Sequence, residues 1–519
     1  MTSPAVRAGT VAFIASFCTL VIELVAGRVL APYVGVSLYT WTSIIGVVLA
    51  GISAGAWAGG WLADRRPAPS TLGWLLIAAG LLSILIAPAT GYLAADDGML
   101  TRLGIATTLL QRVVVLSFVL FFLPSFFLGM ISPVAVKLAV RELDTAGRVV
   151  GRIYAVSTLG SIAGTFVTGF YLVARFGTRT TLVGVGVVLI ATALVFGGLF
   201  GRVGRAAALA ILAGGAAYAG LWPASPSLPP DQRLVYESRA LGVIHTEESQ
   251  YYTIQVERTV RGDTGALLHA LQLDHLTHSY SDLDDPSYLE YGYMRIFEDI
   301  VARGGSRYLF IGGGGYTLPR YIHDTYPHAR VDVVEIDPAV TRVARRYFAA
   351  PRGPRIRTIN EDARWFSMRD GHGPYDAIFI DAFNDLSVPY HLTTREQTLR
   401  LHEMLAPGGV LTANLIDDFN RGRFLGSYVR TLQSVFGDEH VIVVLEGEED
   451  KEATRSTFIV AASTSRLTFE DGAYILQGAE LRRWLAARDT IILTDDYAPV
   501  DNMLAPLFRE RFVDELQGE

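Results

Sequence analysis

Four consecutive glycines and a carboxylate are spaced as a nucleoside site requires. The glycines follow an apolar run that ends at Ile311, and a second apolar run ends at residue 334, about 20 residues beyond the glycines. Glycine lets a backbone approach a ligand where any Cβ would clash, and a carboxylate after a strand can accept two hydrogen bonds from a ribose diol. The residues predicted to contact a nucleoside here are Gly312, Gly313, Gly314, Gly315, Glu335 and Ile336.

The glycine run alone has a second interpretation, which is a tight strand-to-helix turn in some other α/β domain. The coincidence of turn, spacing and terminal acid favours the nucleoside. The chain has no G-x-x-x-x-G-K-[ST] phosphate loop, which argues against a nucleotide triphosphatase. Adenosine without phosphates fits the pattern better.

Two further acids fall where later strands are expected to end. Asp362, followed by Ala363, comes after a predicted strand at 355–359 and could read the amino edge of adenine, whereas Asp381 closes the predicted strand 375–381. Strands at 410–416, 441–445 and 457–462 would complete a sheet of about seven strands. Because ligands of open α/β sheets bind outside the carboxyl ends of the strands, all these side chains are expected to converge on one site.

The composition divides the chain into two halves. Of 519 residues 50% are hydrophobic and the mean hydropathy is +0.32, and the long uncharged runs lie within residues 8–221. A net charge of -7 gives no basic footprint for nucleic acid. The predicted organisation is a multi-pass membrane domain at 1–222, a Pro/Ser linker at 223–232, a small β-rich lead-in at 233–285 and an α/β domain at 286–519.

Seven apolar segments approach the length that crosses a bilayer, of which the last is short and rich in Ala and Gly. They are about residues 8–30, 38–62, 72–94, 110–131, 150–173, 178–200 and 205–222. Basic residues such as Arg65 and Arg66 place the N-terminus in the cytoplasm of a plasma-membrane protein. Seven crossings would put the α/β half outside and six would put it inside, and the sequence leaves this choice open.

Two ionisable residues, Glu23 and Arg28, interrupt the first apolar segment. Charged groups at membrane depth are costly and usually face a bundle interior or a wet cavity, which fits a transport path. The alternative is that Arg28 reaches the interface and Glu23 pairs with another helix. Glycines repeated every four residues, at Gly51, Gly55 and Gly59 and again at Gly160 and Gly164, predict close helix packing.

The residues from about Tyr236 to Leu415 resemble a spermidine synthase, the aminopropyltransferase branch of the methyltransferase-like Rossmann fold. The whole chain resembles bacterial membrane proteins that fuse several helices to such a domain. The glycine run with Glu335-Ile336-Asp337-Pro338, the pair Asp362-Ala363, YDAIFID at 375–381 and LAPGGVL at 405–411 carry the likeness. The resemblance implies Glu335 on the ribose, Asp362 and Ala363 at the adenine, and Asp381 as the catalytic carboxylate facing an amine.

The resemblance also implies a donor and partners. The expected donor is decarboxylated S-adenosylmethionine or S-adenosylmethionine, with no metal, and the expected partners are an amine or polyamine and the lipid bilayer; a homo-oligomer is left open. Asp385 could hold the distal cation of the amine or be an ordinary loop acid, and Asp496 could line a lid or belong to a simple turn. The predicted acceptor-binding residues are Tyr252, Asp274, His278, Tyr280, Asp385 and Asp496.

Two departures from the family pattern weaken the expected specificity. Spermidine synthases usually carry aspartate at the fourth position of the glycine run, where Gly315 stands, and serine-serine-aspartate-proline where this chain has residues 382–385. A carboxylate at the former position would repel the carboxylate of S-adenosylmethionine, since a charge pair at ~4 Å is worth roughly 1 to 4 kcal/mol. A methyltransferase acting on a membrane-presented acceptor, and a transporter with a non-catalytic nucleoside-sensing domain, therefore stay as alternatives to aminopropyl transfer.

Overall fold

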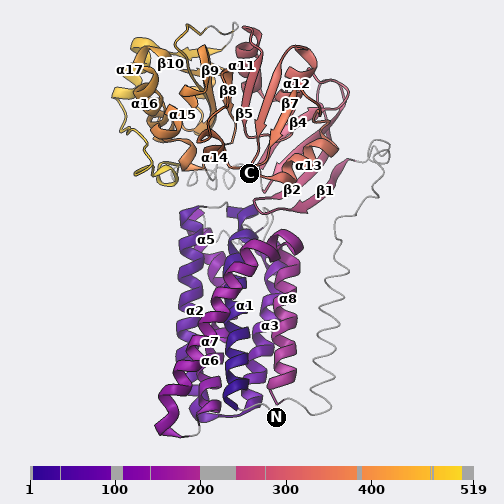
Figure 1. The fold of residues 1–519 in the computed structure, drawn as a ribbon, viewed down its shortest axis with the longest axis vertical. Coiled ribbons are helices and arrows are strands. Elements are labelled where there is room, and N and C mark those ends of the chain that lie inside the picture. Colours follow the sequence, from indigo (N-terminus) through magenta and orange to yellow (C-terminus); the bar gives the residue numbers. More distant parts are fainter. Residues whose placement is uncertain are drawn as a thin grey trace. The chain divides into compact units, whose positions relative to one another are not determined.

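A computed structural model describes residues 4–34, 37–94, 109–140, 142–198, 241–274, 276–382, 388–467, 469 and 473–504. The chain divides into a helical unit, Met1–Ser227 with Glu248–Tyr252, and an α/β unit, Leu228–Glu247 with Thr253–Glu519. Figure 1 shows long helices in the first and a central sheet with surrounding helices in the second.

The helical unit contains six helices that are long and apolar enough to cross a membrane, counted over the described residues. They coincide with the first six predicted segments, whereas the predicted seventh, at 205–222, lies outside the described residues. The elements are α1 (Pro4–Val34), α2 (Leu38–Arg65), α3 (Pro69–Ala94), α5 (Leu109–Ser117), η1 (Phe118–Phe122), α6 (Leu123–Ala139), η2 (Leu143–Thr145), α7 (Ala146–Val167), η3 (Thr168–Leu172) and α8 (Val173–Phe196).

Glycines bring the helices of this unit into backbone contact. A Cβ added to Gly55 of α2 would lie 2.0 Å from the carbonyl oxygen of Phe126 in α6, and one added to Gly164 of α7 would lie 2.5 Å from that of Phe17 in α1. No larger side chain fits at these crossings unless the helices separate. The predicted role of the regularly spaced glycines in helix packing is therefore confirmed.

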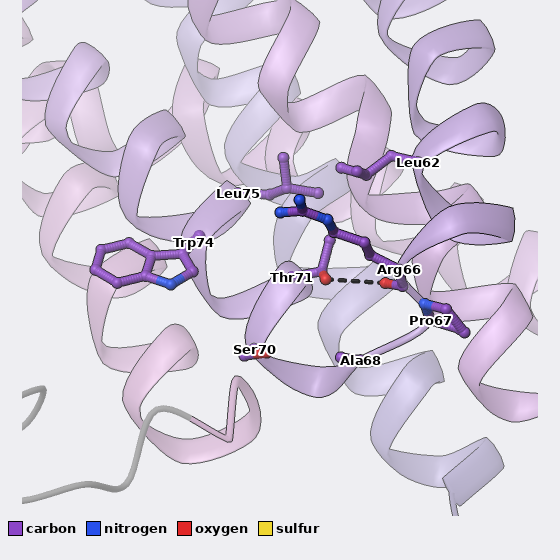
Figure 2. A pocket seen from close by; sticks show the side chains of 8 residues that line it. All are labelled: Leu62, Arg66, Pro67, Ala68, Ser70, Thr71, Trp74 and Leu75. Atoms are coloured by element: carbon purple, nitrogen blue, oxygen red, sulfur yellow. Dashed lines mark hydrogen bonds between the residues drawn. The ribbon is translucent and has the colours of Figure 1, made fainter.

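A cavity of about 560 Å³ lies where α2 ends and α3 begins (Figure 2). The carbonyl of Arg66 accepts a hydrogen bond from the Thr71 hydroxyl (2.9 Å), which fixes the connection between the helices. Trp74 is 63% exposed beside it. None of the predicted site residues lines this cavity; its lining is Leu62, Arg66, Pro67, Ala68, Ser70, Thr71, Trp74 and Leu75.

The α/β unit begins with a four-stranded antiparallel sheet in the order β1-β2-β3-β4. Its strands are β1 (Gly242–Glu248), β2 (Thr253–Val260), β3 (Leu267–Leu273) and β4 (Leu276–Asp282). Within this sheet β2 and β3 pair in antiparallel register, with Ile254 opposite Leu273. The helix α11 (Gly292–Ala302) then leads into the main sheet.

The main sheet has eight strands in the order β12-β10-β11-β9-β8-β5-β6-β7, one more than predicted, because the short β12 adds an edge. Its strands are β5 (Arg307–Ile311), β6 (Arg330–Val334), β7 (Ile356–Ile359), β8 (Tyr375–Ile380), β9 (Leu405–Asp417), β10 (Val441–Leu445), β11 (Ser456–Ala462) and β12 (Tyr474–Leu476). The helices between and after them are α12 (Thr317–Thr325), α13 (Pro338–Tyr347), α14 (Ala363–Ser367), α15 (Arg395–Glu403), α16 (Phe424–Phe436) and α17 (Gly478–Ala486). Short 3-10 turns complete the unit: η4 (Tyr390–Leu392), η5 (Asp438–His440) and η6 (Glu448–Lys451).

The centre of this sheet is parallel, because β5 pairs with both β6 and β8 in parallel register. The stacked rings of Phe310 and Phe379, 4.6 Å apart, fill the core between neighbouring strands. Asp337 caps α13 by accepting from the amide of Ala339 (2.8 Å), ahead of Pro338 at the first turn. Strand, turn and cap thus place the ends of β5, β6, β7 and β8 at one edge of the sheet.

Candidate active site

The glycine run forms a turn with positive φ at its first and third positions, a conformation that favours glycine. Gly312 has φ +97° and Gly314 has φ +47°, and a Cβ on Gly312 would lie 2.2 Å from the carbonyl oxygen of Asp381. The turn after β5 therefore rests directly on the backbone that follows β8. This contact joins the predicted donor-binding residues to the predicted catalytic acid.

Glu335 follows β6 and holds the glycine turn from the other side. Its Oε2 accepts from the amide of Gly313 (2.8 Å) and its Oε1 from that of Asp337 (2.9 Å). Burial raises the pKa of Glu335, and the amides of Asp337 and Gly313 act in the opposite direction. Each carboxylate oxygen keeps a second lone pair, which is what a ribose diol would need.

Asp362 is the N-cap of α14. Its Oδ1 accepts from the amides of Arg364 (2.7 Å) and Trp365 (3.3 Å), and its Oδ2 lies 3.1 Å from His391 Nε2. Ala363 is buried as the first residue of the helix. The predicted contacts of Asp362 and Ala363 with adenine stay predictions, and His391 is a neighbour that the sequence did not indicate.

Asp381 is held between two hydrogen-bond donors from distant parts of the chain. Tyr293 in α11 donates its hydroxyl to Oδ2 (3.1 Å), and Asn414 in β9 donates Nδ2 to Oδ1 (3.0 Å). Burial raises the pKa of Asp381, whereas the hydrogen bonds from Asn414 and Tyr293 lower it. The carboxylate is thus fixed in position with its basicity increased.

The side-chain oxygen of Asn414, Oδ1, is buried and has no hydrogen-bond partner among the described residues. Its orientation follows from chemistry, because the ionised carboxylate of Asp381 only accepts and Nδ2 must face it. An unsatisfied buried acceptor is costly unless a ligand donates to it. Asp381 and Asn414 therefore present two adjacent acceptors suited to the N–H groups of one molecule.

A row of tyrosine rings leads to this pair of acceptors. The ring of Tyr291 stacks on Tyr293 with centroids 5.7 Å apart and lies 5.5 Å from Tyr280 of β4. Tyr291 donates its hydroxyl to the carbonyl of Thr277 (2.8 Å). Aromatic faces attract organic cations, so the predicted acceptor residue Tyr280 belongs to a surface that would suit an ammonium group.

The other predicted acceptor residues have separate positions. Tyr252 lies in the β1–β2 turn, where its amide donates to Ser249 Oγ (2.9 Å). Asp274 has φ +55° in the β3–β4 turn and accepts from the amide of Thr253 (2.9 Å). His278 is half-buried in β4, and Asp385 lies outside the described residues.

The exposed Asp496 lies in the turn that Thr494 and Tyr497 close by pairing their backbones. Its neighbour Asp495 forms an ion pair with Arg364 and accepts from Thr394 Oγ1 (2.7 Å). These contacts tie the turn to α14, the helix that Asp362 caps. Among the described residues no cluster of three or more His, Cys, Asp or Glu side chains is placed to hold a metal ion.

Gly315 faces a serine and an aromatic ring. Its amide donates to Ser279 Oγ of β4 (2.9 Å), and a Cβ added to it would lie 2.7 Å from the Cβ of Ser279 and 3.2 Å from the ring of Phe348. The space that an aspartate side chain at this position would enter is already filled. Ser279 and Phe348 thus pack closely against Gly315, the position where the family pattern has aspartate, and together the three residues form what we call the Gly315 wall.

The comparisons with known proteins agree with the motifs. No family model matches the chain. A polyamine aminopropyltransferase of Vibrio vulnificus is 35% identical over 165 residues, which cover 31% of this chain and 54% of that protein. Polyamine aminopropyltransferase 1 of Streptomyces coelicolor is 25% identical over 440 residues, covering 81% of this chain and 78% of that one. The chain is similar in sequence to polyamine aminopropyltransferases.

The resemblance inferred from the motifs is therefore confirmed. The match of 440 residues exceeds the length of the α/β half, so the similarity extends into the helical half. With the Vibrio vulnificus protein, the chain spans only about half the length of that relative. A solved probable spermidine synthase from Corynebacterium glutamicum aligns with a TM-score of 0.43 at 24% identity, over 51% of this chain and 99% of that one.

Substitution of Tyr293 tests how its hydrogen bond affects the pKa of Asp381. The Tyr293→Phe change removes a hydrogen bond that lowers the pKa of Asp381, so the pKa rises further above its usual value. A general base at Asp381 would have to be ionised, so activity that depends on it would be lost as pH falls through this pKa. We therefore expect the acidic limb of the kcat/KM profile to move to higher pH in Tyr293→Phe. Tyr308→Phe, which removes another buried hydroxyl of the same unit, is the control. An acidic limb that stays in place or moves to lower pH in Tyr293→Phe would contradict this role.

Proposed function

We propose that the protein transfers an aminopropyl group from decarboxylated S-adenosylmethionine to an amine. The observation that carries this proposal is the pair formed by Asp381 and the unpartnered oxygen of Asn414, which together would accept the N–H groups of a primary amine. The relatives named polyamine aminopropyltransferase support the same reaction class.

In the proposed reaction the amine nitrogen attacks the carbon next to the sulfonium sulfur in line with the departing group. A C–N bond forms, the C–S bond breaks with its electron pair going to sulfur, and a neutral thioether leaves. An ammonium with pKa near ~10 cannot attack, so its proton must pass to Asp381 or through it to solvent. Alignment of the two substrates by the rigid turn and the acid would supply much of the acceleration.

On the donor side the glycine turn and Glu335 would hold the ribose, and Asp362 with Ala363 the adenine. Each carboxylate oxygen of Glu335 accepts one backbone hydrogen bond and keeps a second lone pair for a ribose hydroxyl. Gly313 and Gly314 have no side chains that would keep a ligand away from the turn. Tyr280, Tyr291 and Tyr293 would surround the acceptor cation with ring faces.

One observation favours the second candidate, methyl transfer from S-adenosylmethionine. The wall at Gly315 presents Ser279 and Phe348 in place of a carboxylate, so it offers no charge that would repel the carboxylate of S-adenosylmethionine. The chemistry at Asp381 suits an amine acceptor in either reaction. The identity of the donor decides between them.

Calorimetric titration of the full chain in detergent with each donor separates the two candidates. We expect decarboxylated S-adenosylmethionine to bind about tenfold more tightly than S-adenosylmethionine, because the buried Ser279–Phe348 wall has no cation to receive the additional carboxylate. Tighter binding of S-adenosylmethionine would favour the methyltransferase. Binding of neither compound would overturn both.

We also propose that the helical unit crosses the plasma membrane. Six helices have the length and composition for it. At the end of α2 the guanidinium of Arg65 stacks on Trp61 (3.8 Å), and Trp74 lies exposed at the start of α3. Arg and Trp concentrate where a span leaves the hydrocarbon. Sedimentation with membranes that resists alkaline extraction would support this placement, and release by alkali would contradict it.

A further inference from the structure

The helical half contains an internal repeat. The pattern F-x-x-S-F occurs at 13–17 and at 122–126, and G-x-x-A-G occurs at 51–55 and at 160–164. Both pairs are separated by the same distance, since 122 − 13 = 109 and 160 − 51 = 109. A third pattern, I-x-x-V-A at 22–26 and 131–135, has the same offset. Self-similarity at a fixed period indicates a repeated structural unit.

The repeated residues are those that join the helices. In one half, Cβ atoms on Gly51 and Gly55 of α2 would touch the carbonyls of Phe122, at the end of η1, and of Phe126 in α6. In the other, those on Gly160 and Gly164 of α7 would touch the corresponding carbonyls of α1, at Phe13 (2.3 Å) and Phe17 (2.5 Å). The second helix of each half thus packs its glycines on the first helix of the other half.

The two halves run in opposite directions. Gly160 of α7 lies against Phe13 of α1 and Gly164 against Phe17, so residue numbers increase in the same direction along both helices, which are therefore parallel. Consecutive membrane spans such as α6 and α7 run in opposite directions. It follows that α1 is antiparallel to its counterpart α6. The third helices, α3 and α8, meet at Gly80 and Gly186, where a Cβ on either would lie under 3 Å from the carbonyl of the other (2.8 and 2.6 Å). This reciprocal contact is what a pseudo-two-fold axis requires.

An inverted repeat of three helices is an architecture typical of membrane transporters, whose binding sites lie where the halves meet within the bilayer. Glu23 of α1 lies about 12 Å inside the end of its apolar segment at Ala31, given roughly 1.5 Å per residue. Its counterpart in the repeat is Ser132, so the shared fold does not require a carboxylate there.

The surroundings of Glu23 suit a positively charged ligand. The side chain is half-buried, and no hydrogen bond or ion pair joins it to any of the described residues. One turn further along the same face, the ring of Trp41 packs on Gly27, where an added Cβ would meet it at 2.9 Å. Seven residues before Glu23, Ser16 shares a hydroxyl contact with Ser157 of α7. An acid and an indole within one turn form a recognition pair for an organic cation.

We infer that the helical unit is an inverted repeat that binds an organic cation, with Glu23 as its carboxylate and Trp41 as its aromatic partner. The ligand class is a primary amine of the kind that the α/β unit is proposed to alkylate, and this choice of class rests on the proposed function. Such a site would let the membrane half collect or release the amine on which the α/β half acts.

The test is equilibrium binding of radiolabelled 1,4-diaminobutane to the full chain in lipid nanodiscs. Two classes of site are expected, and Glu23→Gln should weaken one of them about tenfold by removing a charged hydrogen-bond acceptor. The transfer rate at saturating amine should not change. Glu142→Gln, which alters an exposed acid of the same unit, is the matched control. The Asp381→Asn variant should lose aminopropyl transfer but keep the class of diamine-binding sites that depends on Glu23.

Binding by Glu23→Gln that equals that of the unchanged protein would overturn the inference. So would a loss of transfer in Glu23→Gln that accompanies the loss of binding, because it would show that the change disturbs the whole protein. Failure of the proposed function has a different signature: the unchanged protein would show no transfer while its Glu23-dependent binding persisted.

Discussion

Asp381→Asn is expected to lower amine transfer by about 10² to 10⁴-fold, the range that loss of a general base produces. The amide cannot accept the proton of the attacking amine. The geometry should survive, because the new oxygen can still accept from Tyr293 and Asn414 can rotate its amide to present its own oxygen to the new N–H. Single-turnover rates with saturating donor measure the effect.

Asp370→Asn is the control for this experiment, because Asp370 is an exposed acid of the same unit. Donor affinity of Asp381→Asn should match that of the unchanged protein, since the part of Asp381 that lies against the glycine turn is its backbone carbonyl, which the substitution keeps. Full activity in Asp381→Asn would remove the residue from the mechanism. An equal loss in both variants would point to a general effect of charge.

Glu335→Ala should weaken donor binding by about 10 to 100-fold, because hydrogen bonds to a charged group are worth about 1.5–3 kcal/mol. The change also leaves the amides of Gly313 and Asp337 without their acceptor, so the turn loosens at the same point. Both effects weaken binding of the sulfonium donor and leave binding of the amine unchanged. Titration calorimetry with the donor measures the loss.

Glu298→Ala serves as its control, because Glu298 is another hydrogen-bonded acid of the α/β unit, paired with the Tyr321 hydroxyl. Thermal unfolding of both variants separates a local loss from a global one. Unchanged donor affinity in Glu335→Ala, with the protein folded, would mean that the ribose binds elsewhere.

Local patterns in the sequence were enough to predict the strands that carry the site. The runs before Gly312 and Glu335 are apolar and short, and each ends where a turn residue or an acid follows, so the ends of β5 and β6 were predicted to the residue. The partners of Asp381 could not be found this way. Tyr293 lies 88 residues before it and Asn414 lies 33 residues after it, and only the pairing of β8 with β9 brings Asn414 close.

A weak signal for one of these residues was present. Asn414 is the single amide in the mostly apolar run VLTANLI, and a buried polar side chain in such a run needs a partner. Ser279 gave no such signal, because it stands among other polar residues in β4 and lies 36 residues before Gly315 in the chain. The internal repeat of the helical half is visible in the sequence, but only when its two halves are compared at an offset of 109 residues.

The most direct measurement is identification by mass spectrometry of what the full chain makes from a diamine and decarboxylated S-adenosylmethionine. We predict an amine extended by one aminopropyl group together with methylthioadenosine in equal amount, both strongly reduced with Asp381→Asn. A methylated product formed from S-adenosylmethionine, or no product from either donor, would contradict it.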